Sequence, residues 1–244
     1  MALSRESPRV GVTHHLALWS PDLPRRLREE TTRSPGQPIR MARIGDDPFG
    51  RTLADVLPTG YGIRPLAVED APALAAAYSR NRAHLAPWDP RRTEEFFTEA
   101  GQRKDAEAKL ESAGLGLQDP WLLVHGDEVV GRVNLNNLVR GVFQNASLGY
   151  WVDRQHTGRG LGTAAVGFAL RRAVELGLHR VEAGTLVGNV ASQAVLRRCG
   201  FEQYGEAANY LFIAGAWQDH LLFQRILHDR PVGAAARLSR RRTT

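Results

Sequence analysis

Runs of alternating and helically spaced apolar residues extend from about residue 61 to about residue 227. Alternation over a short run predicts a strand, and apolar residues three and four apart predict a helix. We expect strands at 61–66, 121–125, 129–135, 146–153 and 179–186, and on both sides of the turn 214–216. We expect helices at 68–81, 93–113, around 166–174 and within 188–201.

This order of elements, β-α-α-β-β-β-α-β-α-β-β, predicts an α/β (α+β) domain with a mixed, mostly antiparallel sheet flanked by helices. Gly126-Asp127-Glu128 is a turn between two strands, and Gly200 is a C-cap for the last helix. In the strand 146–153, Leu148, Tyr150 and Val152 share one face and Trp151 lies on the other.

The two ends of the chain lack this patterning. Residues 1–58 are rich in Ser, Pro, Arg and Glu, which predicts a mostly disordered extension. Residues 230–244 end in RLSRRRTT and predict a mobile basic tail. The patterned segment 59–229 is therefore expected to form the domain.

Composition narrows the class of protein. Hydrophobic residues make up 43% and charged residues 24%, as in a soluble globular protein, and no apolar run is long enough for a membrane span. The single cysteine, Cys199, excludes an internal disulfide and fits a reducing cytoplasm. Eight histidines without HExxH spacing or cysteine partners predict no metal site. The net charge of +6 suits an anionic cofactor or a ribosome-associated substrate, although arginine codons of a GC-rich genome explain it equally well.

A glycine-rich loop, RQHTGRGLGTAAV (154–166), stands between a predicted strand and a predicted helix. It lacks the lysine of a nucleotide-triphosphate loop and the spacing of a dinucleotide fingerprint. Gly158 and Gly160 can take positive φ and expose backbone N–H groups, which form an anion site with the helix N-terminus. Arg154 and Arg159 add positive charge. A pyrophosphate fits this loop, and a tight turn that binds nothing is the alternative.

The motif Gln155-x-x-Gly158-x-Gly160 resembles the acyl-CoA signature of the GNAT N-acetyltransferases. Segments 80–90, 131–153, 188–201 and 209–220 resemble the RimJ/RimL branch of that family, and the RimJ type most closely. The resemblance implies the GNAT acyl-CoA N-acyltransferase fold and transfer of an acetyl group from acetyl-CoA, with CoA as product, to a primary amine.

The resemblance also implies where acetyl-CoA binds. The strand before the loop diverges from its neighbour and pairs with the pantetheine arm, while the loop wraps the pyrophosphate. The cofactor-binding residues it implies are Tyr150, Trp151, Val152, Gln155, Thr157, Gly158, Arg159, Gly160, Leu161, Gly162, Thr163, Asn189 and Ser192.

The same resemblance assigns the catalytic groups. Ser192 lies near the thioester sulfur, and Leu196 occupies the place of the tyrosine that serves many GNAT enzymes as general acid. The leaving thiolate would then take its proton from Ser192 or from water. The residues themselves mark no clear general base: Glu182, the candidate, lies on the strand after the helix, and Asp127 and Glu128 lie at a hairpin tip. A water relay to a distant carboxylate is the alternative. An α-amino group, with a pKa of about 7.7–8.0, places the smallest demand on a base.

The acceptor groove is expected across the sheet from the cofactor. Its candidate residues are Trp88, Asn136, Phe143, Tyr150 and Tyr210. Core packing is the alternative for Trp88 and Phe143, and a hydrogen bond at a turn or strand end is the alternative for Asn136. Trp217 and Asp219 are expected to pin the last hairpin, His156 to be exposed, and Cys199 to pack in its helix.

Three functions remain open at this stage. The leading hypothesis is acetylation of the N-terminal amine of a protein, a ribosomal one included, by direct attack in the cytoplasm. The others are acetylation of a small amine such as an antibiotic, and a non-catalytic module that binds CoA or the ribosome. We expect a monomer or homodimer, without sequence-specific contacts to nucleic acid.

Overall fold

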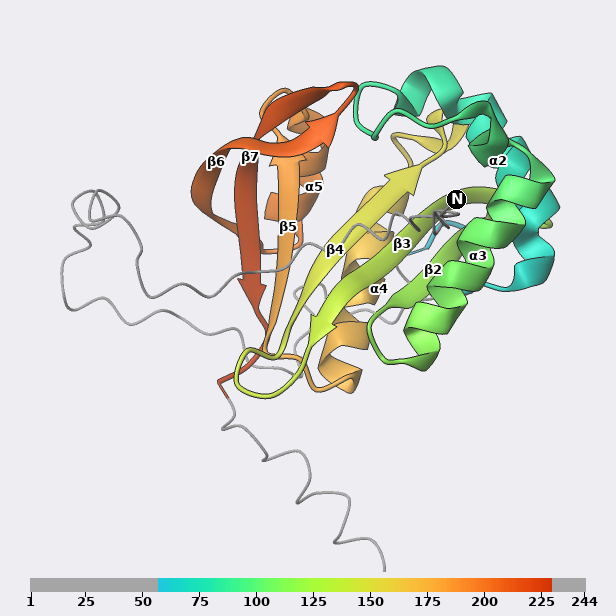
Figure 1. Ribbon diagram of the computed structural model, residues 1–244. Coiled ribbons are helices and arrows are strands. Elements are labelled where there is room, and N and C mark those ends of the chain that lie inside the picture. Colours follow the sequence, from blue (N-terminus) through green and yellow to red (C-terminus); the bar gives the residue numbers. More distant parts are fainter. Residues whose placement is uncertain (1–56, 230–244) are drawn as a thin grey trace, which may run out of the picture. The chain divides into compact units, whose positions relative to one another are not determined.

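A computed structural model of the protein describes residues 57–229, and the predicted extension before residue 57 and tail from residue 230 lie outside this range. One seven-stranded sheet runs through the described part in the order β1-β2-β3-β4-β5-β7-β6 (Figure 1). Its strands are β1 (Tyr61–Pro65), β2 (Asp119–His125), β3 (Glu128–Val139), β4 (Asn145–Val152), β5 (Arg180–Leu186), β6 (Glu202–Ile213) and β7 (Ala216–Ile226). Only β4 and β5 pair in parallel, so the prediction of a mostly antiparallel sheet is confirmed.

Helices cover both faces of this sheet (Figure 1). Within residues 57–229 the α-helices are α2 (Ala71–Leu85), α3 (Glu99–Gly114), α4 (Leu161–Glu175) and α5 (Val190–Arg198), and the short 3₁₀ turns are η2 (Val68–Asp70), η3 (Glu94–Phe97) and η4 (Arg154–His156). Leu148, Tyr150 and Val152 pack with α4 and α5, whereas Trp151 packs with α2 and α3. The alternation expected for β4 is thus confirmed, and it defines an α4/α5 face and an α2/α3 face. None of the helices among residues 57–229 is long and apolar enough to cross a membrane.

Strands β4 and β5 stay together for only three residue pairs. Their register joins Asn145 to Arg180, Ala146 to Val181 and Ser147 to Glu182. Beyond Ser147 the two strands diverge, as Figure 1 shows, and the rest of β4 leans away from β5. The part of β4 that precedes the glycine loop therefore has one edge that β5 does not cover.

Two elements begin elsewhere than expected. Helix α3 begins at Glu99 instead of residue 93, because η3 forms first and the Thr98 side chain caps the helix by accepting the Gly101 N–H. A Cβ at Gly101 would lie 1.9 Å from the Glu95 carbonyl oxygen, so this close approach requires glycine. The apolar pattern before the turn 214–216 begins only at Asn209, but strand β6 begins at Glu202, because its first half is an exposed sheet edge without apolar alternation.

Candidate active site

The glycine loop leads directly into α4. Gly158 has φ +74° and Gly160 has φ +79°, and a Cβ at either position would meet no atom within 4 Å. Glycine is therefore required by the backbone conformation, not by lack of space. Gly160 is the N-cap of α4, and the first N–H groups of a helix have no partner within the helix. The loop and this positive helix end fit a pyrophosphate.

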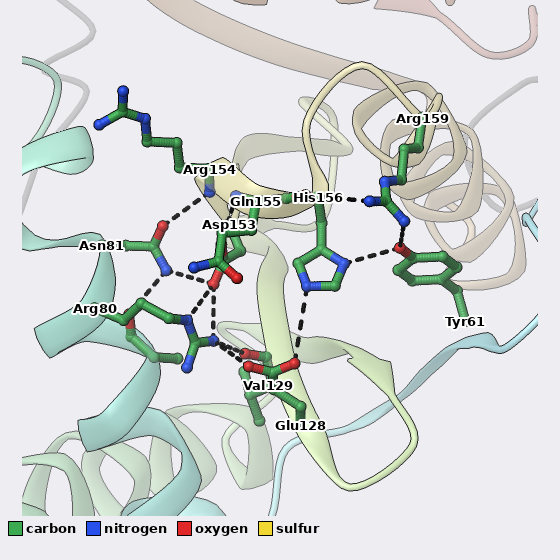
Figure 2. Close-up of polar contacts among 11 residues, drawn as sticks. Tyr61, Arg80, Asn81, Glu128, Val129, Asp153, Arg154, Gln155, His156 and Arg159 are labelled. Carbon is green, nitrogen blue, oxygen red and sulfur yellow. Dashed lines mark hydrogen bonds and ion pairs between the residues drawn. The ribbon is translucent and has the colours of Figure 1, made fainter.

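Asp153 anchors the start of this loop to α2 (Figure 2). Its fully buried carboxylate accepts hydrogen bonds from Arg80 Nε at 2.7 Å, Asn81 Nδ2 at 2.6 Å and the Gln155 N–H at 2.8 Å. Burial on its own would raise the pKa of Asp153, but these donors together lower it below its ordinary value. The carboxylate is therefore charged and holds the loop in place.

A second contact joins the loop to β1. Tyr61 Oη lies 2.8 Å from His156 Nδ1 and accepts a hydrogen bond from Arg159 Nη1 at 3.1 Å (Figure 2). His156 Nε2 lies 3.8 Å from a carboxylate oxygen of Glu128. The expectation that His156 is exposed is wrong: only 8% of the residue is exposed, because Tyr61 and the β2–β3 hairpin enclose its ring. Its side chain fixes the shape of the loop.

The start of α5 faces Tyr150 on the α4/α5 face. Asn189 caps this helix by accepting the Ser192 N–H at 3.1 Å, and the Ser192 hydroxyl lies 3.0 Å from the Tyr150 hydroxyl. The tyrosine ring packs against α4 at Gly162, where a Cβ would lie at the ordinary contact distance of 3.7 Å from it. Burial raises the pKa of Tyr150 to about 12, so the phenol is protonated at neutral pH. The structure therefore brings Asn189, Ser192 and Tyr150 together.

Further along α5, the helix contributes only to the core. Leu196 is fully buried and Cys199 is 1% exposed. Burial raises the pKa of the Cys199 thiol to about 11, which makes it a poor nucleophile at neutral pH. The expected packing role of Cys199 is confirmed, and the Leu196 side chain carries no proton to donate.

Glu182 lies on the α2/α3 face of β5, next to the point where β4 and β5 separate. One carboxylate oxygen accepts hydrogen bonds from Arg180 and from the Tyr204 hydroxyl, the latter at 3.2 Å. The other accepts from Asn145 Nδ2 at 2.9 Å. Both oxygens therefore already accept hydrogen bonds, from residues of β4, β5 and β6. The role of Glu182 as a base stays a prediction.

A pocket of about 630 Å³ lies across the sheet from α4, at the far end of β5. Its lining comes from the loop after α2, the end of β5 and the last hairpin: Pro87, Trp88, Leu186, Val187, Gly188, Asn209, Trp217, Gln218 and Asp219. The loop after α2 and the β6–β7 turn are bridged, since the Ala214 N–H donates to the Asp89 carbonyl at 3.2 Å and Arg91 Nε donates to the Ala214 carbonyl at 3.1 Å. Figure 1 shows this turn meeting the loop that follows α2. We call this cavity the bridged pocket.

Two of the five predicted acceptor residues lie at the bridged pocket, and the other three lie elsewhere. Trp88 lines the bridged pocket, and Tyr210 lies beside it, with its ring centroid 5.4 Å from that of His220. Asn136 of β3 pairs with Ser147 of β4 and lies near Gly149. Phe143 lies in the β3–β4 turn, next to the closed end of the β4–β5 pair, so the structure does not bring it to the pocket. Tyr150 points to the α4/α5 face, toward Ser192.

The last hairpin holds its shape through Asp219, as expected. Ala207 pairs with His220 and Leu211 with Gln218, so three residues of β6 face one of β7. Asn209, at φ +50°, sits in this bulge and donates its N–H to Asp219 at 2.7 Å. No local sequence pattern signals the bulge or the parts played by Asp89 and Arg91, because bridges between distant loops leave no such pattern. Among residues 57–229 no group of three or more His, Cys, Asp or Glu side chains could hold a metal ion.

Comparison with known proteins now identifies the family. Residues 62–202 match the family described as "Acetyltransferase (GNAT) domain". The chain is a GNAT acetyltransferase. It is 34% identical over 165 residues to the probable N-acetyltransferase YjcK of Bacillus subtilis, covering 65% of this chain and 89% of the relative. It is also 34% identical over 160 residues to the ribosomal protein uS5-alanine N-acetyltransferase of Escherichia coli, covering 63% of this chain and 80% of the relative.

A solved structure supports the donor as well as the fold. Mycobacterium smegmatis RimJ in complex with CoA-disulfide superposes with a TM-score of 0.66 at 31% identity, covering 74% of this chain and 88% of that one. These matches confirm the predicted RimJ/RimL likeness, fold class and N-acetyltransferase activity of this GNAT protein. That neighbour holds CoA, the product expected from the predicted donor acetyl-CoA.

Proposed function

We propose that this GNAT acetyltransferase acetylates the N-terminal α-amino group of a protein, and specifically of a ribosomal protein with a small first residue. The observation that carries this proposal is the bridge from Asp89 and Arg91 to Ala214. Because the bridge joins two walls of the pocket, a chain end can enter lengthwise, whereas an internal segment would need room for chain on both sides. The Escherichia coli relative named for ribosomal protein uS5-alanine supports the same acceptor class.

On the α4/α5 face, the proposal assigns the donor to the glycine loop and β4. The N–H groups from Gly158 to Thr163 would hold the pyrophosphate, with Gln155, Thr157 and Arg159 beside them. The uncovered edge of β4 at Tyr150, Trp151 and Val152 would pair with the pantetheine arm. Support comes from the positive φ of the two glycines and from the divergence of β4 and β5.

The reaction then uses both faces of the sheet. The amine attacks the thioester carbonyl from the bridged pocket, and a backbone N–H of the diverging strand polarises that carbonyl. Ser192 gives a proton to the leaving thiolate, since its hydroxyl sits at the capped start of α5 beside Tyr150. We place this reaction in the cytoplasm, where ribosomal proteins are made, and propose the ribosome or its free proteins as partner.

Three acceptors test the proposal. The first is a peptide with an N-terminal alanine and no lysine, the second is the same peptide with a blocked N-terminus and one added lysine, and the third is an aminoglycoside. Thiol release from acetyl-CoA gives the rate, and mass spectrometry locates the acetyl group. We expect turnover with the first peptide only. Turnover restricted to the aminoglycoside or to lysine would contradict the proposal.

A further inference from the structure

His220 lies on β7 at the floor of the α2/α3 face. Its neighbour Leu221 and Phe223 pack into the core under α4 and α5, so alternation directs His220 to the opposite face. It pairs with Leu186, the last residue of β5 and part of the lining of the bridged pocket. The residue is only 4% exposed. A histidine therefore lies at the same end of β5 as the pocket and the start of α5.

The hydrogen bond of this imidazole fixes its tautomer. Nδ1 lies 3.0 Å from the Gln218 carbonyl oxygen. A carbonyl oxygen carries no proton, so Nδ1 must be the donor, and in the neutral ring Nε2 then carries the lone pair. Nothing within residues 57–229 forms a hydrogen bond with Nε2. The ring is thus oriented with its basic nitrogen available.

The space beside this nitrogen is open because of Gly184. Although β5 lies in the middle of the sheet, Gly184 is exposed, and it faces the same side as His220. A Cβ at Gly184 would lie 3.6 Å from both His220 Cδ2 and Tyr210 Cε1. Since Nε2 is bonded to Cδ2, it borders this space. A side chain at position 184 would fill the place where a small amine can approach the imidazole.

The bulge in β6 completes the surroundings. It turns Tyr210 over the sheet to lie 5.4 Å, centroid to centroid, from His220. The other titratable groups nearby are Glu182, which faces the same side of β5, and Asp219, whose carboxylate is used by the Asn209 N–H. Glu182 is occupied by Arg180, Tyr204 and Asn145 on both oxygens. Unlike these two carboxylates, His220 has a basic atom that accepts no hydrogen bond from residues 57–229.

We propose that His220 Nε2 is the general base of the acetyl transfer. The nitrogen lone pair of the acceptor amine forms the C–N bond with the thioester carbonyl carbon, and the C–S bond breaks. Nε2 takes the proton that the amine nitrogen loses, and the thiolate takes a proton from water or from Ser192, whose hydroxyl is then reprotonated by solvent. The imidazolium then returns its proton to solvent, so no other reactant is needed. The inference rests on the proposed function for the position of the amine, and its test uses whichever amine the wild-type enzyme acetylates.

The test compares His220→Ala and His220→Gln with Glu182→Gln, which removes the other candidate base, and with His84→Gln, at a half-buried histidine of α2, as the matched control. We expect both His220 variants to lose about 100-fold or more in kcat, the range of general-base contributions. His84→Gln should stay within a few fold of wild type, and Glu182→Gln should lose less than either His220 variant. Added imidazole should restore part of the rate of His220→Ala alone, because the space above Gly184 admits it, and a merely structural role would give no such rescue.

Two further readouts do not depend on activity. The Kd of each variant for acetyl-CoA, measured by calorimetry, should match wild type, which shows that the fold and donor site are intact. Nitrogen-15 NMR of labelled histidine, assigned with His220→Gln, should show His220 as the Nδ1–H tautomer. An Nε2–H tautomer, or full activity of His220→Gln with a large loss in Glu182→Gln, would overturn the proposal. If the wild-type enzyme does not acetylate N-terminal peptides, the proposed acceptor is wrong. The role of His220 is then tested by measuring the same variants with the lysine peptide or the aminoglycoside as acceptor.

Discussion

The hydroxyl groups of Tyr150 on β4 and Ser192 on α5 lie 3.0 Å apart. The two residues are far apart in sequence and meet where the tyrosine ring packs against α4 at Gly162. Since Ser192 is also held through its N–H by Asn189, its side chain has a fixed position at the helix start. Tyr150 therefore positions the group that we propose gives up a proton.

Removal of the tyrosine hydroxyl should slow turnover without weakening donor binding. A lost hydrogen bond of about 0.5–1.5 kcal/mol predicts a roughly two- to tenfold lower kcat in Tyr150→Phe. Ser192→Ala should lower kcat more than affinity, and the double variant should be no slower than Ser192→Ala, because the tyrosine acts through the serine. Steady-state kinetics and calorimetry check this. Independent, multiplied losses would show that Tyr150 has a role of its own.

The raised pKa of Tyr150 also predicts how the rate depends on pH. The pKa of Tyr150 is raised to about 12 by burial, so its protonated form persists until the pH approaches that value. Between pH 7 and pH 10 we therefore expect kcat to change with pH in the same way in wild type and in Tyr150→Phe. Rate profiles of both proteins over this range provide the measurement.

Gly160 and Gly177 offer a matched pair at the two ends of α4. Both have positive φ, +79° and +72°, and a Cβ at either would meet nothing within 4 Å. Alanine at either position carries a similar strain, about 1–2 kcal/mol. Only Gly160→Ala should also weaken acetyl-CoA binding, by roughly tenfold, because it distorts the N–H groups at the start of the helix. Equal Kd values for the two variants would place the pyrophosphate elsewhere.

Arg91 joins the loop after α2 to the β6–β7 turn, and both segments adjoin residues that line the bridged pocket. Arg91→Ala removes the hydrogen bond to the Ala214 carbonyl, and a bond of about 1 kcal/mol predicts a several-fold higher KM for the peptide. The Kd for acetyl-CoA should not change. Arg103→Ala is the control, since Arg103 pairs only with Glu99 on the exposed surface of α3. An equal rise of KM in both variants would show that the bridge does not contribute to peptide binding.

Asp153 links stability to pH. Its pKa is lowered in the folded protein, so its contribution is present at neutral pH and is lost as the pH falls through the folded-state pKa. Asp153→Asn leaves Arg80 without its buried partner and should lower the free energy of unfolding by about 3 kcal/mol at pH 7. The difference from wild type should narrow on acidification. Urea unfolding at several pH values measures it, with the exposed Asp127→Asn expected to change little.

Local patterns were sufficient to predict every strand and α-helix, because apolar alternation and helical spacing mark each buried face. They failed where the chain is exposed, as in the first half of β6, and where a cap competes with a helix, as at Thr98. The donor loop was predictable because its glycines and arginines are contiguous. His220 was not, since its importance comes from a bare glycine on β5 and a bulge in β6, which only the folded sheet brings together.

A crystal structure with a bisubstrate compound tests the account most directly. The compound joins the sulfur of CoA, through an acetyl linker, to the N-terminal nitrogen of an alanine-initiated peptide. We predict the pyrophosphate at the N–H groups of residues 158–163, and the peptide under the bridge between Arg91 and Ala214. Its linked nitrogen should lie within hydrogen-bond reach of His220 Nε2, about 2.6–3.2 Å. A peptide bound outside the bridged pocket, with its nitrogen remote from His220, would contradict the account.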